Sequence, residues 1–359
     1  MGPLTPMWGW PSTILRHPEN SIEGRMTQEE AKRFLDAFRD GRARTLVHEM
    51  MEQYYAEAVL ENHPKSASLN RGEIHRQTRD LCTDIFGSVA QVTDDPQALY
   101  PLLSKLSRGH RPMAAFWFPE FNEAYENYKH RRKLEIKLEQ LKPFLGTGSY
   151  ADIGCGGGDL VGYLKENYGK FSSYTGIDVM DWRSESVREK IDFRMFNFAH
   201  PEGTLADTFD FATCMAVIHH VGRDEASRLR FLRNIRESLN PGGRLLVEED
   251  VMLLPEEIAA NSGYQQETGQ LRKEQPLYGA YLDLGRQEQE HVLILIDLLA
   301  NSLTVGVPDM DFPFGFLSID EWIRLFRKAG YVPEKIKITG FVRGTFNRSS
   351  HVIYLLRRN

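Results

Sequence analysis

The amino-acid sequence predicts an α/β fold with a doubly wound, mostly parallel sheet, together with a helical N-terminal region and a helical insertion. Two observations support this prediction. From residue 149 onward, short runs rich in β-branched and aromatic residues alternate with helical segments, which is typical of βαβ units. The first run, "SYADIGC", leads into the glycine-rich stretch "GGGDL", which fits a turn from a strand into a helix. Because such crossovers are right-handed, a doubly wound sheet is expected.

The N-terminal part of the chain has a helical texture over residues 27–127. Thr27 and Glu30 have the spacing of a capping box at the start of the first helix. Gly41 is expected to end that helix, and Pro64 to end the next one. Residues 1–26 form a separate extension, in which "IEGR" reads either as an engineered protease site or as part of a natural extension before an internal start.

The α/β domain is expected to span residues 128–359. Its first five strands are predicted in "YADIGC", "SYTGIDV", "IDFRMFNF", "FDFATCMAVIHH" and "RLLVEEDV". A helical insertion over 255–313 follows the fifth strand. Ser318 and Glu321 then repeat the capping-box spacing, and the helix they begin ends near Gly330. The closing segments "EKIKITGFV" and "SHVIYLLRR" have no helix between them, so they are expected to pair as an antiparallel hairpin.

The composition argues against several classes of protein. The net charge of −6 provides no basic field, so no nucleic-acid partner is predicted. No run reaches the roughly 18 apolar residues that a membrane-spanning helix needs, so no membrane partner is predicted. The cysteines Cys82, Cys155 and Cys214 form no CxxC pair, which fits reduced thiols and a cytoplasmic location.

The glycine-rich turn predicts a ligand site at the carboxyl ends of the strands. Gly154 and Gly156 allow a ligand to approach the backbone closely. A P-loop would need Gly-Lys-Ser/Thr after the glycines, and a dinucleotide fingerprint would need glycine where Asp159 stands, so both are excluded. Asp152 places a carboxylate at the rim of the turn, which suits an ammonium better than a pyrophosphate.

Two more polar residues follow neighbouring strands. Asp178 ends the second strand, where a carboxylate accepts hydrogen bonds from the hydroxyls of a ribose. Asn197 ends the third strand, where an amide can meet the edge of an adenine. With the glycines and Asp152, these residues describe a site for a cationic amino-acid nucleoside.

The motifs in this order resemble those of the class I S-adenosylmethionine-dependent methyltransferases, of the type that acts on small molecules. The resemblance rests on "ADIGCGGGDL", "GIDV", "FNFAH", "FDFATCMAVIHHV" and "LNPGGRLLVEEDV", and covers about residues 128–251 and the elements from 318 onward. It implies a seven-stranded sheet of order 3-2-1-4-5-7-6 with strand seven antiparallel, and S-adenosylmethionine as the cofactor. It also implies a set of cofactor-binding residues, which are Tyr128, Asp152, Gly154, Cys155, Gly156, Asp178, Val179, Asn197, Phe198 and Met215. The family more often has Asp where this chain has Asn197.

Candidate catalytic residues follow strands four and five. His219 and His220 are candidates for a general base; alternatively, one packs under the cofactor and the other caps the next helix. Glu249 lies among three acids at the end of strand five, which either face the pocket or are solvated. Asp297 shares a helical stripe with Glu290 and Asn301, which either faces a substrate cavity or is the wet face of a buried helix. No metal site is predicted.

These features predict a methyltransferase that modifies an O or N atom, with C also considered, of a small and partly apolar metabolite, as in secondary metabolism. Tyr125 and Tyr128 either cover the cofactor or pack in the core. The residues of 27–127 and 255–313 are expected to form lids, substrate walls or the contacts of a homodimer. The rival interpretations are a cyclase or decarboxylase that retains the cofactor, and a cofactor-binding module without catalysis.

Overall fold

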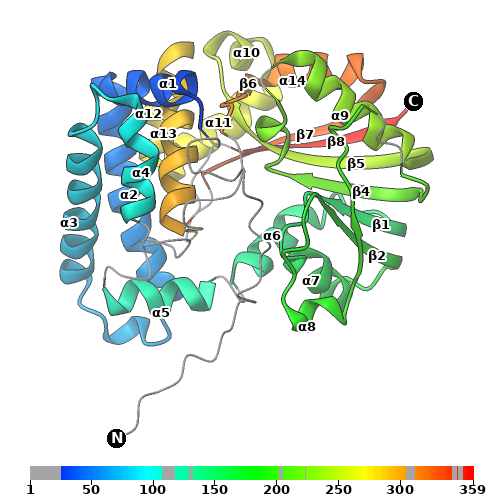
Figure 1. The fold of residues 1–359 in the computed structure, drawn as a ribbon, viewed down its shortest axis with the longest axis horizontal. Helices are drawn as coiled ribbons and strands as arrows, with labels where there is room; N and C mark the ends of the chain where they lie inside the picture. Colours follow the sequence, from blue (N-terminus) through cyan, green and yellow to red (C-terminus); the bar gives the residue numbers. More distant parts are fainter. Residues whose placement is uncertain are drawn as a thin grey trace, which may run out of the picture.

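The structure is a computed structural model that describes residues 26–106, 118–128, 132–201, 205–222, 224–304, 312–341, 346 and 351–359. The predicted extension over residues 1–26, with its "IEGR" sequence, lies outside the described residues except for Met26. A central sheet with helices on both faces forms one side of the molecule, and a layer of helices forms the other (Figure 1).

The sheet has the predicted order. Its strands run β3-β2-β1-β4-β5-β8-β7, and the two-residue strand β6 pairs separately with β5. β8 is antiparallel to both β5 and β7, as expected for the hairpin at the end of the chain. The bounds are β1 Gly148–Ile153, β2 Phe171–Asp178, β3 Asp192–Met195, β4 Phe209–Met215, β5 Leu239–Met252, β6 Leu317–Ser318, β7 Tyr331–Gly340 and β8 His351–Arg358. The prediction of a doubly wound, mostly parallel sheet is therefore confirmed, with β6 as an addition.

Alternate residues of the strands pack into two separate cores, one on each face of the sheet. Tyr150 of β1 packs with Val161 and Leu164 of α7 (Asp159–Asn167) and with Leu141 at the end of α6 (Lys133–Leu141). Its neighbour Ala151 belongs to the larger core. That core includes residues of α9 (Glu225–Glu237) and α14 (Ile319–Lys328). The short helix α8 (Glu185–Arg188) precedes β3.

The helical layer combines segments from both ends of the sheet-forming sequence. Helices α1 to α5 precede the sheet and α10 to α13 follow β5, as predicted, and α1, α2, α12 and α13 lie side by side (Figure 1). Their bounds are α1 Gln28–Arg39, α2 Gly41–Asn62, α3 Arg71–Ala90, α4 Leu99–Leu106, α5 Pro119–Asn127, α10 Pro255–Ala260, α11 Ser262–Glu274, α12 Pro276–Leu282 and α13 Arg286–Thr304. Ion pairs join α13 to the N-terminal helices: Arg33 contacts Glu290 at 3.0 Å, and Asp40 contacts His291 at 2.8 Å.

Side-chain caps begin several helices. The capping boxes predicted at Thr27–Glu30 and at Ser318–Glu321 are both present. The sequence suggested that Gly41 ends the first helix. In the structure, Gly41 is instead the first residue of α2. Asp40 makes this possible because its side chain accepts hydrogen bonds from the first free amides of α2, those of Arg42 and Ala43.

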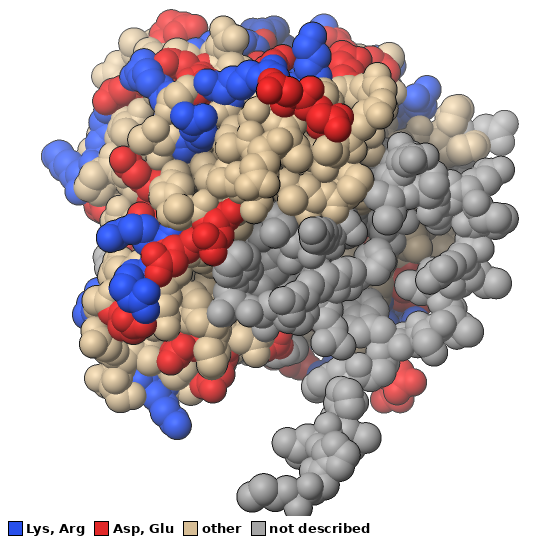
Figure 2. All heavy atoms as spheres, turned by 60° about the vertical axis from the view of Figure 1, so that its left-hand side comes forward, with Lys and Arg blue, Asp and Glu red and all other residues tan. Residues whose placement is uncertain are grey.

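The surface of the helical layer carries charges of both signs. On the described part of this face, Lys and Arg lie among Asp and Glu (Figure 2). None of the described helices combines the length and the apolar character that crossing a bilayer requires.

Candidate functional site

The glycine turn after β1 lies at the centre of the sheet, between β2 and β4. Gly154 has a φ of 73°, and a Cβ there would lie 2.5 Å from Cγ2 of Val217 in the segment after β4. Gly156 has a φ of 52°, but a Cβ there would meet nothing within 4 Å. The turn therefore packs tightly on the sheet side at Gly154 and leaves open space beside Gly156, where a ligand can approach the backbone.

Asp178 at the end of β2 faces this turn. Its Oδ2 accepts a hydrogen bond from the backbone N–H of Gly156 at 2.8 Å, and its Oδ1 accepts one from Val179 N–H at 2.7 Å. Oδ1 also accepts a longer hydrogen bond from Met180 N–H at 3.4 Å, whereas Oδ2 has a second lone pair for a ligand hydroxyl. These backbone contacts fix the orientation of the carboxylate beside the open space.

Exposed apolar side chains continue this site along the ends of β2 and β3. Val179, Met180 and Met195 are 55%, 41% and 72% exposed, and these are the large hydrophobic side chains that stand out as exposed in the described part of the chain. Met195 pairs in register with Asp178. Val179 was predicted from the sequence, but the two methionines were not. Met180 follows Asp178 closely in the sequence, and Met195 ends the neighbouring strand opposite Asp178, so their positions could have indicated them. Together they offer an apolar surface for a flat ring.

The third-strand motif lies next to this surface. Phe198 is buried, whereas Asn197 is exposed and its Oδ1 accepts a hydrogen bond from Ala199 N–H at 2.9 Å. That turn uses one lone pair of the amide oxygen, and the amide NH₂ can still donate to a ring nitrogen. The predicted adenine contacts of both residues stay predictions.

Asp152 is buried rather than at the rim where the sequence analysis placed it. Its Oδ1 accepts a hydrogen bond of 2.6 Å from the hydroxyl of Thr213, which in turn lies 2.6 Å from the hydroxyl of Tyr150. Burial, together with the nearby charge of Asp178, raises the pKa of Asp152 to about 7, although the Thr213 hydrogen bond acts in the opposite direction. The cause of the changed location is the register of β1, which places Asp152 beside Thr213 of β4.

A buried ionic network flanks Asp152. Lys137 of α6 contacts both carboxylate oxygens of Glu248, at 2.6 and 2.8 Å, and His351 of β8 lies 3.0 Å from Glu248 and 3.1 Å from Asp250. Burial opposes ionisation of Glu248, but Lys137 and His351 hold its pKa below the ordinary value. The charge of Lys137 also reaches Asp152. The acids at the end of β5 are therefore not solvated, and sequence reasoning did not find Lys137 or His351.

Glu249 points to the face of the sheet opposite to that of Glu248 and Asp250, because successive side chains of a strand alternate between its two faces. Its Oε1 accepts hydrogen bonds from the backbone N–H groups of Val217 and Ile218, at 3.1 and 2.7 Å. Its Oε2 lies 2.6 Å from Nδ1 of His219. These contacts with Glu249 orient the short 3₁₀ turn Ile218–His220 after β4. Glu249 is fully buried behind this turn.

The histidine next to Glu249 carries a strongly shifted pKa. Burial of His219 opposes its protonation, but the charge and hydrogen bond of Glu249, with Asp297 nearby, overcome this and raise the pKa of His219 to about 9. In the ligand-free protein His219 therefore holds a proton at neutral pH, which is unfavourable for a general base. Neither histidine caps the next helix, because Asp224 accepts the hydrogen bond at the start of α9.

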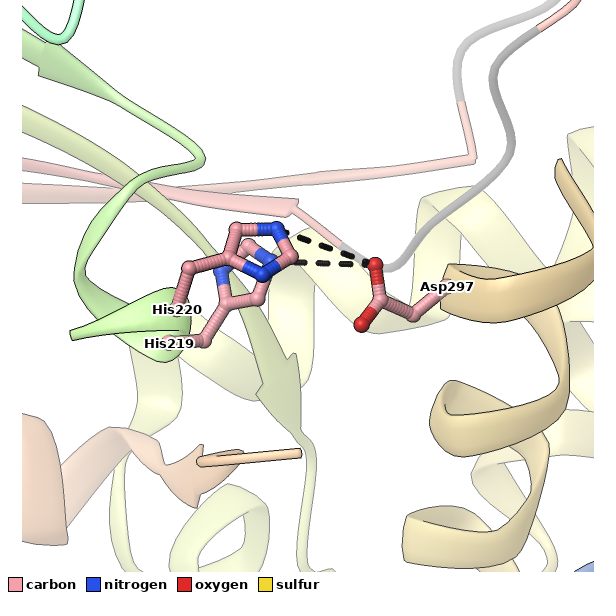
Figure 3. A group of neighbouring side chains, drawn as sticks. All are labelled: His219, His220 and Asp297. Carbon is pink, nitrogen blue, oxygen red and sulfur yellow. Dashed lines mark ion pairs between the residues drawn. The ribbon is translucent and has the colours of Figure 1, made fainter. Parts of the chain in front are cut away.

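His219, His220 and Asp297 converge from two elements (Figure 3). The histidines extend from the 3₁₀ turn, and Asp297 extends toward them from α13. Oδ1 of Asp297 lies 3.9 Å from Nε2 of His219 and 3.9 Å from Nε2 of His220. Asp297 is buried, so the interpretation of its helical stripe as a wet face does not hold for this residue. The side chain of Asn301 lies outside the described part of the structure.

Aromatic rings surround this cluster. Phe316 stacks on His219 with ring centroids 5.4 Å apart, and Phe312 meets His220 edge-on at 5.7 Å. Arg33 of α1 donates hydrogen bonds to the backbone oxygens of Pro313 and Phe314, and so connects the helical layer to this aromatic segment. The polar cluster is thus one end of an otherwise apolar wall.

The remaining predicted residues lie in three settings. Tyr128 is buried and packs against Phe346, with ring centroids 5.3 Å apart. Cys155 is half-buried, and burial raises the pKa of its thiol. Met215 ends β4 and is followed by Ala216, whose φ of 54° is unusual for a residue with a side chain and marks a strained turn into the histidine segment.

The fold and the motif geometry together define a class I S-adenosylmethionine-dependent methyltransferase. A family model described as a methyltransferase domain matches residues 125–335, and the chain belongs to this family. Its cofactor is S-adenosylmethionine. Tyr128, the glycine turn, Asp178 and the histidine turn all fall within the matched segment.

Several solved structures are similar to the chain. A methyltransferase from Thermotoga maritima shares 18% identity, over 66% of this chain and 94% of its own, with a TM-score of 0.40. A methyltransferase from Methanosarcina mazei shares 17%, over 61% and 96%, with a TM-score of 0.37. The N-methyltransferase NodS from Bradyrhizobium japonicum, in complex with S-adenosyl-L-homocysteine, shares 10%, over 65% and 87%, with a TM-score of 0.35. No curated protein matches the sequence.

Proposed function

We propose that this protein transfers the methyl group of S-adenosylmethionine to an O or N atom of a small, partly apolar metabolite. The observation that carries this proposal is the cluster of His219, His220 and Asp297 beside the glycine turn. Val217 packs on Gly154 of that turn, and the histidines follow within the same short segment. The cluster therefore lies next to the cofactor loop and inside an aromatic wall.

The cofactor would lie across the ends of β1, β2 and β3. Asp178 would accept the ribose hydroxyls, and the backbone at Gly156 would border the sugar and the amino-acid chain. Asp152 would attract the ammonium group of the cofactor's amino-acid part. Lys137 is the nearby cation that would attract the carboxylate of that same part. The adenine would rest on Val179 and its exposed neighbours.

The acceptor would approach from the side of α13. In an in-line displacement, a lone pair of the acceptor atom bonds to the methyl carbon while the carbon–sulfur bond breaks and its electron pair stays on sulfur, which yields S-adenosylhomocysteine. A neutral hydroxyl must also give up its proton. The histidine–aspartate cluster supplies the polar groups placed for that step, and Phe312 and Phe316 supply an apolar wall for the rest of the acceptor.

The test incubates the protein with cofactor carrying a labelled methyl group and a metabolite extract. Transfer of label to a small molecule, with formation of S-adenosylhomocysteine, is the expected result. His220→Ala should abolish most transfer while leaving cofactor affinity unchanged. His291→Gln is the matched control. His291 lies on α13, as Asp297 does, but pairs with Asp40 away from the cluster, so this variant should keep full activity.

The same experiment separates the rival functions. A cyclase or decarboxylase would consume its substrate without forming S-adenosylhomocysteine, and a non-catalytic module would bind cofactor without any change in the extract. Either result would overturn the proposal. A nucleic-acid acceptor would place the label in macromolecular material. On the described part of the face in Figure 2, acidic and basic residues are mixed, which argues against a nucleic-acid surface there.

The remaining proposals concern organisation. We propose that residues 27–127 and the insertion over 255–313 together build the acceptor side, because α1, α2, α12 and α13 pack against one another. A homodimer and a cytoplasmic location also stay predictions, which sedimentation and cell fractionation would test.

A further inference from the structure

We propose that His219, His220 and Asp297 form a binding site for one divalent transition-metal ion. Each residue offers one ligand atom, and these three atoms all lie within 4.8 Å of one another. The side chains converge on a common point from the 3₁₀ turn and from α13, as Figure 3 shows. Two imidazole nitrogens and one carboxylate oxygen are a recurring donor set for such ions.

The hydrogen bond to Glu249 is an independent indication of metal binding. A histidine that ligates a metal through one ring nitrogen usually donates its other N–H to a carboxylate, which fixes the tautomer and the ring orientation. Glu249 lies 2.6 Å from Nδ1 of His219, and backbone amides hold this carboxylate in place. With Nδ1–H directed at Glu249, an ion would replace the proton on Nε2, the nitrogen that lies 3.9 Å from Oδ1 of Asp297.

The surroundings favour an ion of charge +2. The carboxylates of Glu249 and Asp297 are both buried next to the two histidines. An ion bound at Nε2 of His219 and Oδ1 of Asp297 would replace the proton of His219 as the positive charge that compensates these buried carboxylates. Phe312 and Phe316 shield the histidine rings, as the apolar shell of a metal site does.

The distances require only a small contraction. Ligand atoms about 2.1 Å from one ion lie about 3.0 Å apart in octahedral and about 3.4 Å apart in tetrahedral geometry. The observed separations between the carboxylate oxygen and the two nitrogens are both 3.9 Å, and the three atoms lie within 4.8 Å of one another, so the ligand atoms must move closer together to bind one ion. Imidazole ligands favour Zn²⁺, Fe²⁺, Co²⁺ or Ni²⁺ over Mg²⁺ and Ca²⁺.

Three protein ligands leave coordination positions open, as catalytic metal sites do. A hydroxyl of the acceptor would take one of these positions, lose its proton to solvent because the ion lowers its pKa, and attack the methyl carbon as the carbon–sulfur bond breaks. This step alone rests on the proposed function. Binding of the ion does not depend on it.

The test begins with full-length protein from which a chelator has removed bound metal. This protein is titrated with Co²⁺, and the visible absorption of the bound Co²⁺ is measured. Zn²⁺ is then added to compete with the bound Co²⁺. We expect one ion per chain, and a loss of affinity of at least about tenfold in His220→Ala and in Asp297→Asn. Glu249→Gln should weaken binding by about 10- to 100-fold. His291→Gln should bind as the unaltered protein does.

Cofactor affinity and the thermal melting curve are recorded for every variant, so that a variant that fails to fold is recognised. If the chelator-treated protein binds no Co²⁺ or Zn²⁺, or if both His220→Ala and Asp297→Asn bind like the unaltered protein, the metal site is wrong. Ion binding without methyl transfer would leave the metal site standing and overturn the proposed function. Transfer that proceeds without any bound ion would overturn the metal-assisted step and leave the proposed function standing.

Discussion

Asp178 is the side chain whose proposed role in cofactor binding is easiest to isolate. Its carboxylate is already oriented by Gly156 and Val179, so a ribose would meet it without rearrangement. We expect Asp178→Asn to weaken binding of S-adenosylmethionine by about 1–3 kcal/mol, because one charged acceptor of the ribose hydroxyls is lost. Calorimetric titration measures this change. Asp192→Asn, at the exposed start of β3, is the control, and equal affinities in both variants would contradict the ribose assignment.

Asp152 should make cofactor binding depend on pH. Its pKa of about 7 means that the carboxylate is half protonated near neutrality, and only the charged form attracts an ammonium group strongly. We expect the affinity for S-adenosylmethionine to rise as the pH increases from about 6 to 8 and then to level off. Titrations across this range, with Asp152→Asn as the reference, measure the effect. A variant with the same pH profile as the unaltered protein would show that another group is responsible.

The same carboxylate should affect stability with the opposite sign. The folded pKa of Asp152, about 7, is above its ordinary value of 3.8, so the folded protein holds a proton that the unfolded chain releases. The contribution of Asp152 to the free energy of unfolding should therefore decrease as the pH rises from about 4 to 7 and stay constant above that. Denaturant unfolding of the ligand-free protein and of Asp152→Asn at several pH values checks this. A difference between them that does not vary with pH would refute it.

Helix α14 depends on its N-cap residue, Ser318. Ser318 accepts the capping hydrogen bond from Glu321 N–H and also donates to Glu257 at the start of the insertion. Ser318→Ala should lower the free energy of unfolding by about 0.5–2 kcal/mol. Chemical denaturation measures the loss, and Ser66→Ala, at an exposed position in a 3₁₀ turn, should have no comparable effect. A stability unchanged by Ser318→Ala would mean that the cap contributes little.

The sequence predicts those elements whose signals are local. The capping boxes, the glycine turn and the alternation of strands and helices all depend on residues a few positions apart, and the structure contains each of them. Contacts between distant segments were not predictable. Lys137 and Glu248 lie 111 residues apart, and no pattern along the chain indicates that they meet. Asp297 was identified by its charge in an apolar helix, but its partners at the end of β4 follow only from how α13 packs.

The whole molecule depends on the contact between its two sides. The larger core runs without a break from the N-terminal helices through α13 to one face of the sheet. A chain that starts at Phe118 would lose α1 to α4 and expose the apolar side of α13. We expect it to aggregate or to unfold without a cooperative transition, which size-exclusion chromatography and thermal denaturation would reveal. A soluble truncated chain that binds cofactor with unchanged affinity would show that the sheet domain is independent.

The helical layer is assembled from two stretches of chain that the sheet separates, and this arrangement constrains inheritance. A single crossover between related genes would exchange one stretch and keep the other. In each of the pairs Arg33–Glu290 and Asp40–His291, the two residues would then come from different parent genes. Replacements at the two members of each pair should therefore occur together, one before the sheet and one on α13.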